Sequence, residues 1–296
     1  MNAKNLGKSL VLVLTMAGGT AWAQVAELYD AVITDKSSIT NPAKAVKDAE
    51  GQWLAFSLPA LEGTRSPCCW KGRWNGRSKG MGQAGCNLDT RHQSFGTSSN
   101  SPLTDNVIVY SEIRDGQVQD LRLVGEHCPV NANGAAVTWI GEVDDKAGLD
   151  WLESLVRQNS KDSEGDMAIY ALSLHRSEEA GKQLYSLAKE TESDFSHEAI
   201  FWLGEARGEQ GFKLLKQLLD ELPMGDRRRE INFALSQNYS PAAAGLLFEI
   251  SKSDPDPGQR GEAMFWLAEA YPQRAQPYLM EVIKTERDED VLEEAV

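Results

Sequence analysis

The chain has 296 residues and an acidic composition, with 44 Asp and Glu residues against 30 Lys and Arg residues and a formal net charge of -14 at pH 7. A surface with this balance repels nucleic acid and anionic lipid. We therefore expect neither nucleic acid nor a membrane surface as a partner.

The first residues have the pattern of a signal peptide. Lys4 and Lys8 precede an apolar stretch over residues 10–17, and Ala23 completes a small-residue motif of the kind that signal peptidases read. The apolar stretch is shorter than the ~20 residues that a membrane-spanning helix needs. We predict a signal peptide over residues 1–23, no membrane span, and a periplasmic or secreted location.

Residues 24–145 have the pattern of a small β-rich domain. Residues 52–58 alternate like a strand. Residues 107–113 and 118–124 predict the two strands of a hairpin, because the Asp-Gly pair between them favours a tight hairpin turn. Residues 136–143 are a further strand candidate.

All four cysteines fall in this region, at Cys68, Cys69, Cys86 and Cys128. In an oxidising compartment, an even number of cysteines in a loop-rich segment usually forms disulfides. We expect two bonds, and the pairing of Cys68 with Cys69 is the least favoured because adjacent residues do not easily reach disulfide geometry. Zinc is the competing interpretation, with His92 or His127 as further ligands, but no CxxC or HxxxH spacing supports it.

The same region holds a basic, tryptophan-containing loop, formed by Arg65, Trp70, Lys71, Arg73, Trp74, Arg77, Lys79 and Arg91. Such a loop is suited to an acidic partner, a glycan or a nucleic-acid strand. Loop composition alone does not make a site. We therefore favour a solvated loop whose charges pair with the acidic second half of the chain.

A sequence pattern returns every 32 residues in the second half of the chain. Glu198, Glu230 and Glu262 occupy the first position of three copies, and each is followed at the same spacing by a Phe and a Leu. A second set of apolar positions keeps the same phase further along each copy. The residues that we expect to form the repeat core are Phe201, Trp202, Leu203, Leu215, Leu218, Phe233, Leu235, Leu247, Ile250, Phe265, Trp266, Leu267, Leu279 and Val282. A period of this length is typical of stacked supersecondary units.

Each unit has the pattern of a pair of helices. In the first helix, the apolar residues recur at i, i+3, i+4 and i+7, the period of one helical face. Breakers such as Gly208 separate the two helices of a pair. Residues 165–174 with 177–190 predict an earlier pair, and residues 148–158 predict a lone helix that closes the amino-terminal end of the stack.

This paired-helix unit has a Glu-Ala start, an aromatic residue and a leucine in its first helix, and Asp, Pro and Arg between units. It resembles the short HEAT repeats of bacteria, of the type called PBS-lyase HEAT-like. The resemblance covers residues 148–296, and it implies an α-α superhelix over residues 146–296. We therefore expect an α+β chain, with a HEAT-like solenoid preceded by a β-rich, disulfide-stapled domain.

The resemblance implies a protein-binding scaffold, and the signal-peptide pattern implies export. We therefore expect an exported, non-catalytic scaffold that mediates protein–protein interaction in the cell envelope, without catalytic residues, metal or cofactor. The alternative is an accessory enzyme of the lyase or metal-dependent hydroxylase type. His197 and Glu198 resemble the His-Glu pairs with which some HEAT-repeat oxygenases hold iron, but Arg229 and Gly261 stand where other units would need the His. One pair does not furnish an iron centre, and the recurrent Glu is more simply a carboxylate at the positive end of a helix dipole.

The last unit stops inside its first helix. Adding 32 to Phe265 gives position 297, one beyond Val296. A solenoid normally ends in a polar capping unit, because each repeat covers its apolar face only by stacking on the next. We therefore predict that the repeats of residues 146–296 are incomplete, and that they belong to a longer solenoid or have an open end that docks against a partner or a second copy.

Overall fold

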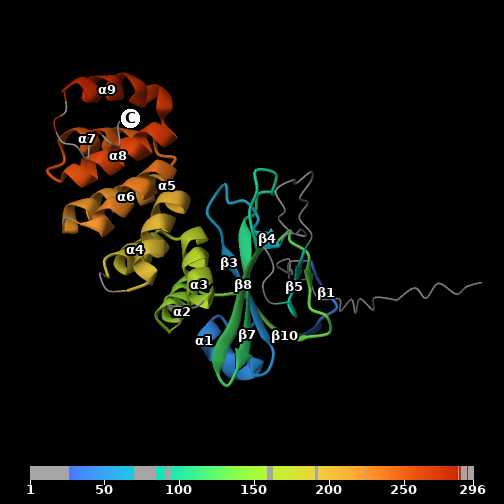
Figure 1. Cartoon of the computed structure of the whole chain (residues 1–296). Coiled ribbons are helices and arrows are strands. Elements are labelled where there is room, and N and C mark those ends of the chain that lie inside the picture. Colours follow the sequence, from blue (N-terminus) through green and yellow to red (C-terminus); the bar gives the residue numbers. More distant parts are fainter. Residues whose placement is uncertain are drawn as a thin grey trace, which may run out of the picture.

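The computed structural model describes residues 27–69, 85–90, 95–158, 163–190, 193–223, 225–285, 287 and 292. The first half of the chain is built mainly from strands, and the second half from helices (Figure 1). The helices lead away from the sheet in chain order, from α2 beside the strands to α9 at the far end of the molecule.

A five-stranded mixed sheet forms the centre of the first half. Its order is β2 (Val32–Asp35), β10 (Ala136–Glu142), β3 (Trp53–Pro59), β7 (Asn106–Arg114) and β8 (Gln117–Gly125). β10 runs parallel to β2 and β3, whereas β3, β7 and β8 are antiparallel neighbours. Every residue of β3 is buried, because this central strand is covered on both faces. The strands expected at residues 52–58 and 136–143 are present, but the sequence does not predict β2, whose four residues are all exposed.

The predicted hairpin consists of β7 and β8. Asp115 and Gly116 have φ angles of 55° and 70°, and two consecutive positive φ values are the mark of a type I′ turn, whose twist matches that of the strands. Glu50 accepts hydrogen bonds from the N–H groups of Asp115 (2.7 Å) and Gly116 (2.9 Å). The loop before β3 therefore holds the turn in place.

Helices cover one face of this sheet. They are α1 (Pro42–Ala45), the 3₁₀ helix Val46–Ala49, α2 (Asp145–Gln158) and α3 (Ser163–Leu174). Leu54, Phe56 and Leu58 of β3 belong to the core on this face, where Phe56 meets the ring of Trp151 edge-on at 5.3 Å. The same core continues into the later helices, so the sheet and the helices share one apolar interior.

The other face of the sheet carries the cysteines. Two small sheets lie there, one of β1 (Leu28–Tyr29), β9 (Val130–Asn131) and β5 (Cys86–Asn87), the other of β4 (Cys68–Cys69) and β6 (Phe95–Gly96). Trp53 and Ala55, which alternate with the residues of the first face, pack in the same apolar cluster as the cysteines. The alternation of β3 therefore separates two buried layers rather than a buried layer and solvent.

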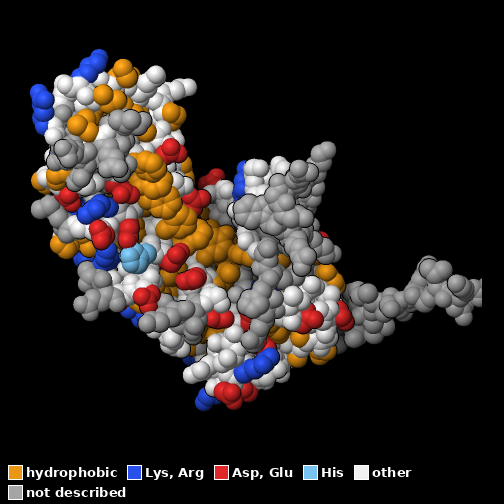
Figure 2. Space-filling model, in the orientation of Figure 1, with side chains coloured by type: hydrophobic (Ala, Val, Ile, Leu, Met, Phe, Trp, Pro, Cys, Tyr) orange, Lys and Arg blue, Asp and Glu red, His pale blue; other side chains and the backbone are white. Residues whose placement is uncertain are grey.

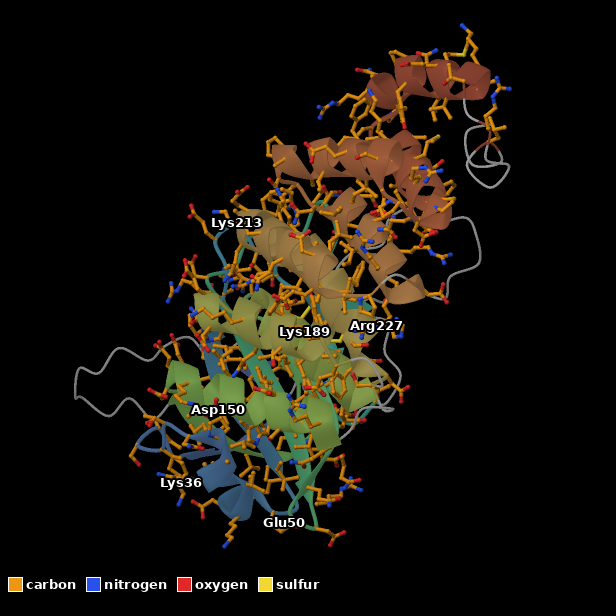
Figure 3. All side chains as sticks on the ribbon, turned by 90° about the vertical axis from the view of Figure 1, so that its left-hand side faces the viewer. Lys36, Glu50, Asp150, Lys189, Lys213 and Arg227 are labelled. Atoms are coloured by element: carbon orange, nitrogen blue, oxygen red, sulfur yellow. A yellow bond between two sulfur atoms is a disulfide. The ribbon has the colours of Figure 1, made fainter. Side chains whose placement is uncertain are left out.

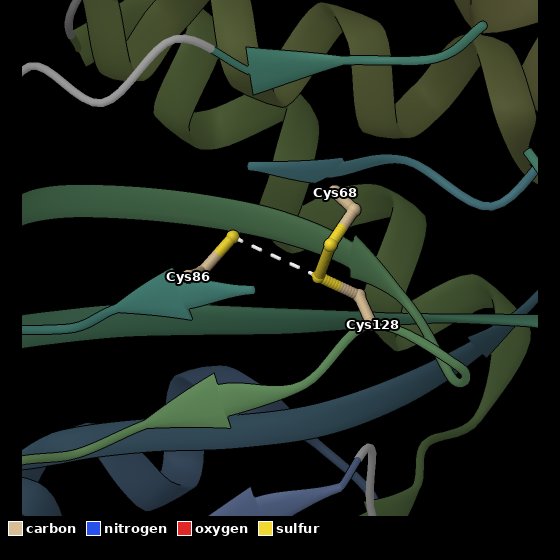
Figure 4. Close-up of side chains that lie close together, drawn as sticks. All are labelled: Cys68, Cys86 and Cys128. Atoms are coloured by element: carbon tan, nitrogen blue, oxygen red, sulfur yellow. Dashed lines mark hydrogen bonds between the residues drawn. A yellow bond between two sulfur atoms is a disulfide. The ribbon is translucent and has the colours of Figure 1, made fainter. Parts of the chain in front are cut away.

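Two disulfides join Cys68 to Cys128 and Cys69 to Cys86. The bridges touch, since Cys86 Sγ lies 3.8 Å from Cys128 Sγ (Figure 4). Disulfides are therefore present as expected, and the zinc interpretation of these cysteines is wrong because their sulfurs are bonded to one another. Of the histidines considered with them, His127 lies 3.6 Å from Glu126, and His92 is outside the described residues.

The helices after the sheet form successive pairs. Those after α2 and α3 are α4 (Glu178–Ala188), α5 (Phe195–Glu221), α6 (Asp226–Gln237), α7 (Pro241–Ser253), α8 (Pro257–Ala270) and α9 (Pro272–Thr285). Each packs against the next along the chain, and α3 also contacts α5 as α6 contacts α8. α5 is two helices joined at Gly208, whose φ of 49° and ψ of -125° are not helical. The helices predicted around residues 148–158, 165–174 and 177–190 correspond to α2, α3 and α4.

Buried polar side chains connect neighbouring pairs. Arg207 is 4% exposed, and it donates to Ser177 O (2.9 Å) and to two further backbone oxygens of the preceding pair. Asn238 does the same one pair later, donating to the oxygens of Gly204 (3.0 Å) and Gly208 (2.9 Å). Burial lowers the pKa of Arg207 to about 10, and these hydrogen bonds replace the hydration that burial removes.

The turn between α3 and α4 joins the two halves of the molecule. Leu61 N donates to Leu174 O (2.8 Å), and Arg176 N donates to Pro59 O (2.9 Å). His175, within this turn, is fully buried, and its Nε2 lies 3.5 Å from a carboxylate oxygen of Asp145. Burial lowers the pKa of His175 to about 4, so this imidazole is neutral at pH 7.

Candidate functional site

A continuous row of aromatic rings, which we call the aromatic stripe, runs along the helices. Its members are Phe95, Tyr170, Trp202, Phe201, Phe233, Trp266 and Phe265. Successive ring centroids are between 4.5 and 6.0 Å apart, a range in which aromatic rings attract one another. Figure 2 shows an apolar band with acidic groups beside it on the hollowed side of the molecule, between the helices and the β-rich half.

The stripe follows the 32-residue period. Tyr170 on α3, Trp202 on α5 and Trp266 on α8 occupy one repeat position. Phe201, Phe233 and Phe265 occupy the position before it. These residues lie on the first helix of each pair, so stacking the pairs brings their rings into line. Phe95 is the exception, since it comes from β6 in the other half of the molecule.

The predicted repeat core separates into buried aliphatic residues and partly exposed residues that are mostly aromatic. The buried members are Leu203, Leu215, Leu218, Leu235, Leu247, Ile250, Leu267 and Val282. Phe201, Trp202, Phe233, Trp266 and Leu279 are only half-buried, and Phe265 is 39% exposed. The prediction of a core position is therefore wrong for Phe265. Phe265 precedes the buried Leu267 by two positions, which is about 200° around the helix and places it on the side facing away from the core.

Carboxylates border the stripe with the same period, at Asp166, Glu198, Glu230 and Glu262. Trp266 Nε1 donates to Glu262 Oε1 at 2.8 Å. Asp166 and Glu198 lie in the first turns of α3 and α5, whereas Glu230 and Glu262 lie further into their helices. Attraction to the helix dipole falls off within the first turn, so it accounts for Glu198 and, contrary to our expectation, not for the recurrence of the Glu.

Two hollows open along the stripe. The first, which we call the junction hollow, has a volume of about 450 Å³ and is lined by Phe95, Asp166, Met167, Tyr170, Glu198 and Trp202 among others. The second, of about 420 Å³, is lined by His197, Glu198, Ile200, Phe201, Glu230 and Phe233. Glu198 lines both hollows, so they are neighbours on one surface.

The junction hollow is a negatively charged environment. Partial burial raises the pKa of Glu198, and the charge of Asp166 raises it further. Partial burial also raises the pKa of Asp166. The pKa of Tyr170 is raised to about 12 by burial and by the charge of Glu205. Two carboxyl groups therefore share a hollow whose other walls are largely apolar.

The His-Glu pair considered as an iron ligand set is engaged differently. His197 Nδ1 lies 2.6 Å from Glu230 Oε1, on the helix of the next pair. Within the described part of the chain, three side chains of metal-ligand type come within 4.8 Å of one another at Cys68, Cys86 and Cys128, whose sulfurs are already in disulfides.

Three residues of this site, Asp166, Tyr170 and Phe95, are not among those predicted from the sequence. Asp166 and Tyr170 stand 32 residues before Glu198 and Trp202, so extending the period one copy towards the amino terminus would have identified both. Phe95 lies in the cysteine-rich segment, and no periodicity in the sequence connects it to the repeats.

The side of the helices that faces the viewer in Figure 3 has a different character. Lys189 pairs with Glu221 at 2.6 Å, and Lys213 with Glu209 at 3.7 Å (Figure 3). Exposed ion pairs of this kind contribute little to stability and keep a surface hydrated. Ion pairs thus occupy this side, while aromatic rings and carboxylates occupy the stripe.

The last described helix carries a second apolar surface. A groove of about 440 Å³ is lined by residues of α8 and α9 that include Met280 and Ile283, which are 54% and 46% exposed.

The basic loop predicted from the sequence is described only in part. Its first member, Arg65, donates from Nη1 to Ser101 O at 3.0 Å. Arg91 and the loop members between Trp70 and Lys79 lie outside the described residues.

In the part of the chain that the structure describes, no helix is both long enough and apolar enough to cross a bilayer. No family model matches the chain, and a comparison with curated proteins found no match either. A functional assignment therefore rests on the aromatic stripe, the carboxylates that border it and the two hollows between them.

Proposed function

We propose that this protein is an exported, non-catalytic scaffold whose helices form a HEAT-like α-α superhelix and whose aromatic stripe binds another protein. The 32-residue period, the paired helices and the hydrogen bonds from Arg207 and Asn238 to the preceding pair support the superhelix. The signal-peptide pattern of residues 1–23 and the two disulfides support export.

The observation that carries the binding role is the incomplete burial of the stripe. Phe201, Trp202, Phe233 and Trp266 are only half-buried, and Phe265 is 39% exposed. Extended apolar patches with a polar rim mark interaction surfaces in soluble proteins, and aromatic residues are enriched in the energetically dominant part of protein interfaces. A row of rings bordered by carboxylates has this composition.

The test is capture of a partner from the native cell envelope, with chemical crosslinking and mass spectrometry. We compare the natural chain, a double variant Phe233→Ser with Phe265→Ser, and a control variant Leu103→Ser, in which an equally apolar and 59% exposed residue of the β-rich half is changed. The same partner should be enriched by the natural chain and the control, and lost from the double variant while circular dichroism stays helical.

Two results would overturn this function. One is equal capture by the double variant. The other is turnover of a small substrate that vanishes when only His197 or Glu198 is changed in a folded chain, which would establish the lyase or hydroxylase alternative instead.

A further inference from the structure

The junction hollow is the place where the two halves of the molecule form one surface. Phe95 comes from β6 of the β-rich half, whereas Tyr170 and Trp202 come from α3 and α5. Phe95 meets Tyr170 edge-on at 6.0 Å, and Tyr170 lies 4.5 Å from Trp202 with a tilt of 38°. Three rings on three elements therefore form the aromatic side of the hollow.

The charged side of the hollow consists of Asp166 and Glu198. No described lysine or arginine lowers the pKa of either carboxyl group. The groups that lower the pKa of Glu198 are the neighbouring His197 and a hydrogen bond from Trp202, which is itself a wall of the hollow. His197 itself lies against Glu230. Several carboxylates elsewhere have close basic partners, such as Asp120 with Arg122 at 2.7 Å and Glu190 with Arg157 at 2.8 Å. The hollow therefore holds negative charge that the described residues leave largely uncompensated.

This combination selects one class of ligand. Two carboxylates repel an anion, and a purely apolar group would leave them partly desolvated without a partner. A cation over an aromatic face is attracted by the ring quadrupole, and a carboxylate beside the ring adds to that attraction. The volume of about 450 Å³ lies within the range of small-ligand sites and exceeds what an ammonium group alone requires.

We propose that the junction hollow binds an organic cation, an ammonium or guanidinium group on an apolar stem, and that a Lys or Arg side chain of the bound protein supplies it. This inference rests on the proposed function, because the stripe brings the partner to the hollow. The apolar stem packs on Tyr170 and Trp202, and the charged end lies between Asp166 and Glu198. The hollow that shares Glu198 receives the neighbouring part of the same segment.

The experiment measures binding of defined probes to the full chain with its disulfides intact. The probes are an acetylated, amidated pentapeptide with a central lysine and aliphatic neighbours, the same peptide with norleucine at the centre, butylammonium chloride, and a neutral trisaccharide. We expect the lysine peptide to bind at least fivefold more tightly than the norleucine peptide. Nuclear magnetic resonance titration suits the weak affinities of such short probes.

Variants locate the binding. Glu198→Gln and Trp202→Leu should each weaken the lysine peptide about fivefold, and Glu198→Gln should remove the preference over norleucine. The matched control is Glu249→Gln, the same change at an exposed carboxylate on α7, which should alter affinity less than twofold. Unchanged circular dichroism spectra and melting temperatures show that the variants are folded.

Each other outcome has a defined meaning. Equal binding of the lysine and norleucine peptides, or binding of the trisaccharide in place of the lysine peptide, overturns the cation site. Butylammonium binding as tightly as the peptide keeps the cation chemistry and overturns its origin in a protein side chain. If the cation site fails while partner capture still depends on Phe233 and Phe265, the protein-binding function is kept and only the cation site is rejected. If partner capture does not depend on these two residues, the protein-binding function is rejected, whatever the peptide titrations show.

Discussion

The two halves of this molecule solve the problem of holding a fold together in different ways. The β-rich half buries both faces of its central strand and adds two disulfides. The helical half has no described disulfide, and it relies on contacts between successive pairs, such as those of Arg207 and Asn238. The half with covalent links covers its central strand completely, whereas the half with repeated contacts leaves a row of aromatic rings partly exposed. A repeated architecture can therefore extend a surface in a way that a single closed core cannot.

The two halves are not independent where they meet. The core is continuous from Phe56 and Trp151 into the helices, and the turn containing His175 exchanges backbone hydrogen bonds with the end of β3. The β-rich half thus covers the first pair of helices, as a capping unit covers the end of a repeat stack. Changes confined to one half should therefore show how much each half contributes to stability.

Removing a disulfide should have the largest effect, and it should fall on the β-rich half. The bridge Cys68–Cys128 closes 60 residues and Cys69–Cys86 closes 17. Chain entropy then predicts losses of about 4 and about 3 kcal/mol when each pair is replaced by serine. Denaturant unfolding measures the losses, and hydrogen exchange should show residues 95–130 opening before the helices. If hydrogen exchange in α6 to α9 increased as much as in residues 95–130, the distinction between the halves would be contradicted. In the natural protein, alkylation should detect no free thiol.

Acid should weaken the junction through His175. Its pKa in the folded protein is about 4, below the usual value of about 6.5, so the unfolded chain takes up a proton first as the pH falls. The contribution of His175 to stability is therefore present above about pH 6.5 and is lost progressively down to about pH 4, by up to about 3 kcal/mol. Urea unfolding at pH 7 and pH 4.5 measures this slope.

The variant His175→Gln should reduce that slope even if its stability at pH 7 is lower. His127→Gln, a change at an exposed histidine of the β-rich half, is the control and should leave the slope as it is. An unchanged slope in His175→Gln would show that other groups cause the acid sensitivity.

A methyl group at Gly204 should separate neighbouring pairs of the helical half. A Cβ at this position would lie 2.1 Å from the backbone oxygen of Ala234 on α6, and backbone cannot move aside as a flexible side chain can. We expect Gly204→Ala to cost about 2 kcal/mol, in the range of overpacked cores. Gly245→Ala is the matched control, because nothing lies within 4 Å of the added Cβ, and it should stabilise the helix by up to about 1 kcal/mol. Thermal melting followed by circular dichroism measures the two variants. Equal melting temperatures for Gly204→Ala and Gly245→Ala would refute the close packing at Gly204.

The smallest effect on stability should come from the stripe itself. Phe265 is 39% exposed, whereas Leu267, two residues later, is 1% exposed. We expect Phe265→Ser to change the free energy of unfolding by less than about 1 kcal/mol and Leu267→Ala to lower it by about 3 kcal/mol. Similar losses in both variants would mean that the stripe is part of the core, and would remove the main support for a binding role.

The sequence predicts the helical half better than the β-rich half, for a physical reason. Helix pairs are local, so the 32-residue period and a breaker such as Gly208 are sufficient to place them. The pairing of β10 with β2 and β3 joins residues 104 and 84 positions apart, such as Ala136 with Val32 and Val137 with Trp53, and no local sequence pattern predicts such a register. The hairpin is the exception, because its turn chemistry at Asp115 and Gly116 is local.

The candidate site was only partly predictable. The period identifies Trp202, Phe233 and Trp266, but it does not say whether such a residue faces the core or its edge, which depends on how the neighbouring pair is placed. It carries no information about Phe95, which reaches the stripe through the tertiary fold. The disulfide partners also depend on the fold, since the sequence leaves two pairings of the four cysteines open.

Carboxylates recur every 32 residues along this surface, at Asp166, Glu198, Glu230 and Glu262, and therefore stand at a regular interval along the stripe. Packed helices are separated by ~8–10 Å, and an extended chain advances ~3.3 Å per residue. An extended segment laid along the stripe would therefore meet a new carboxylate about every third residue. A partner matched to this spacing would carry its basic side chains at that interval, so the distance between neighbouring helices in one protein would set the spacing of charged residues in the sequence of the other.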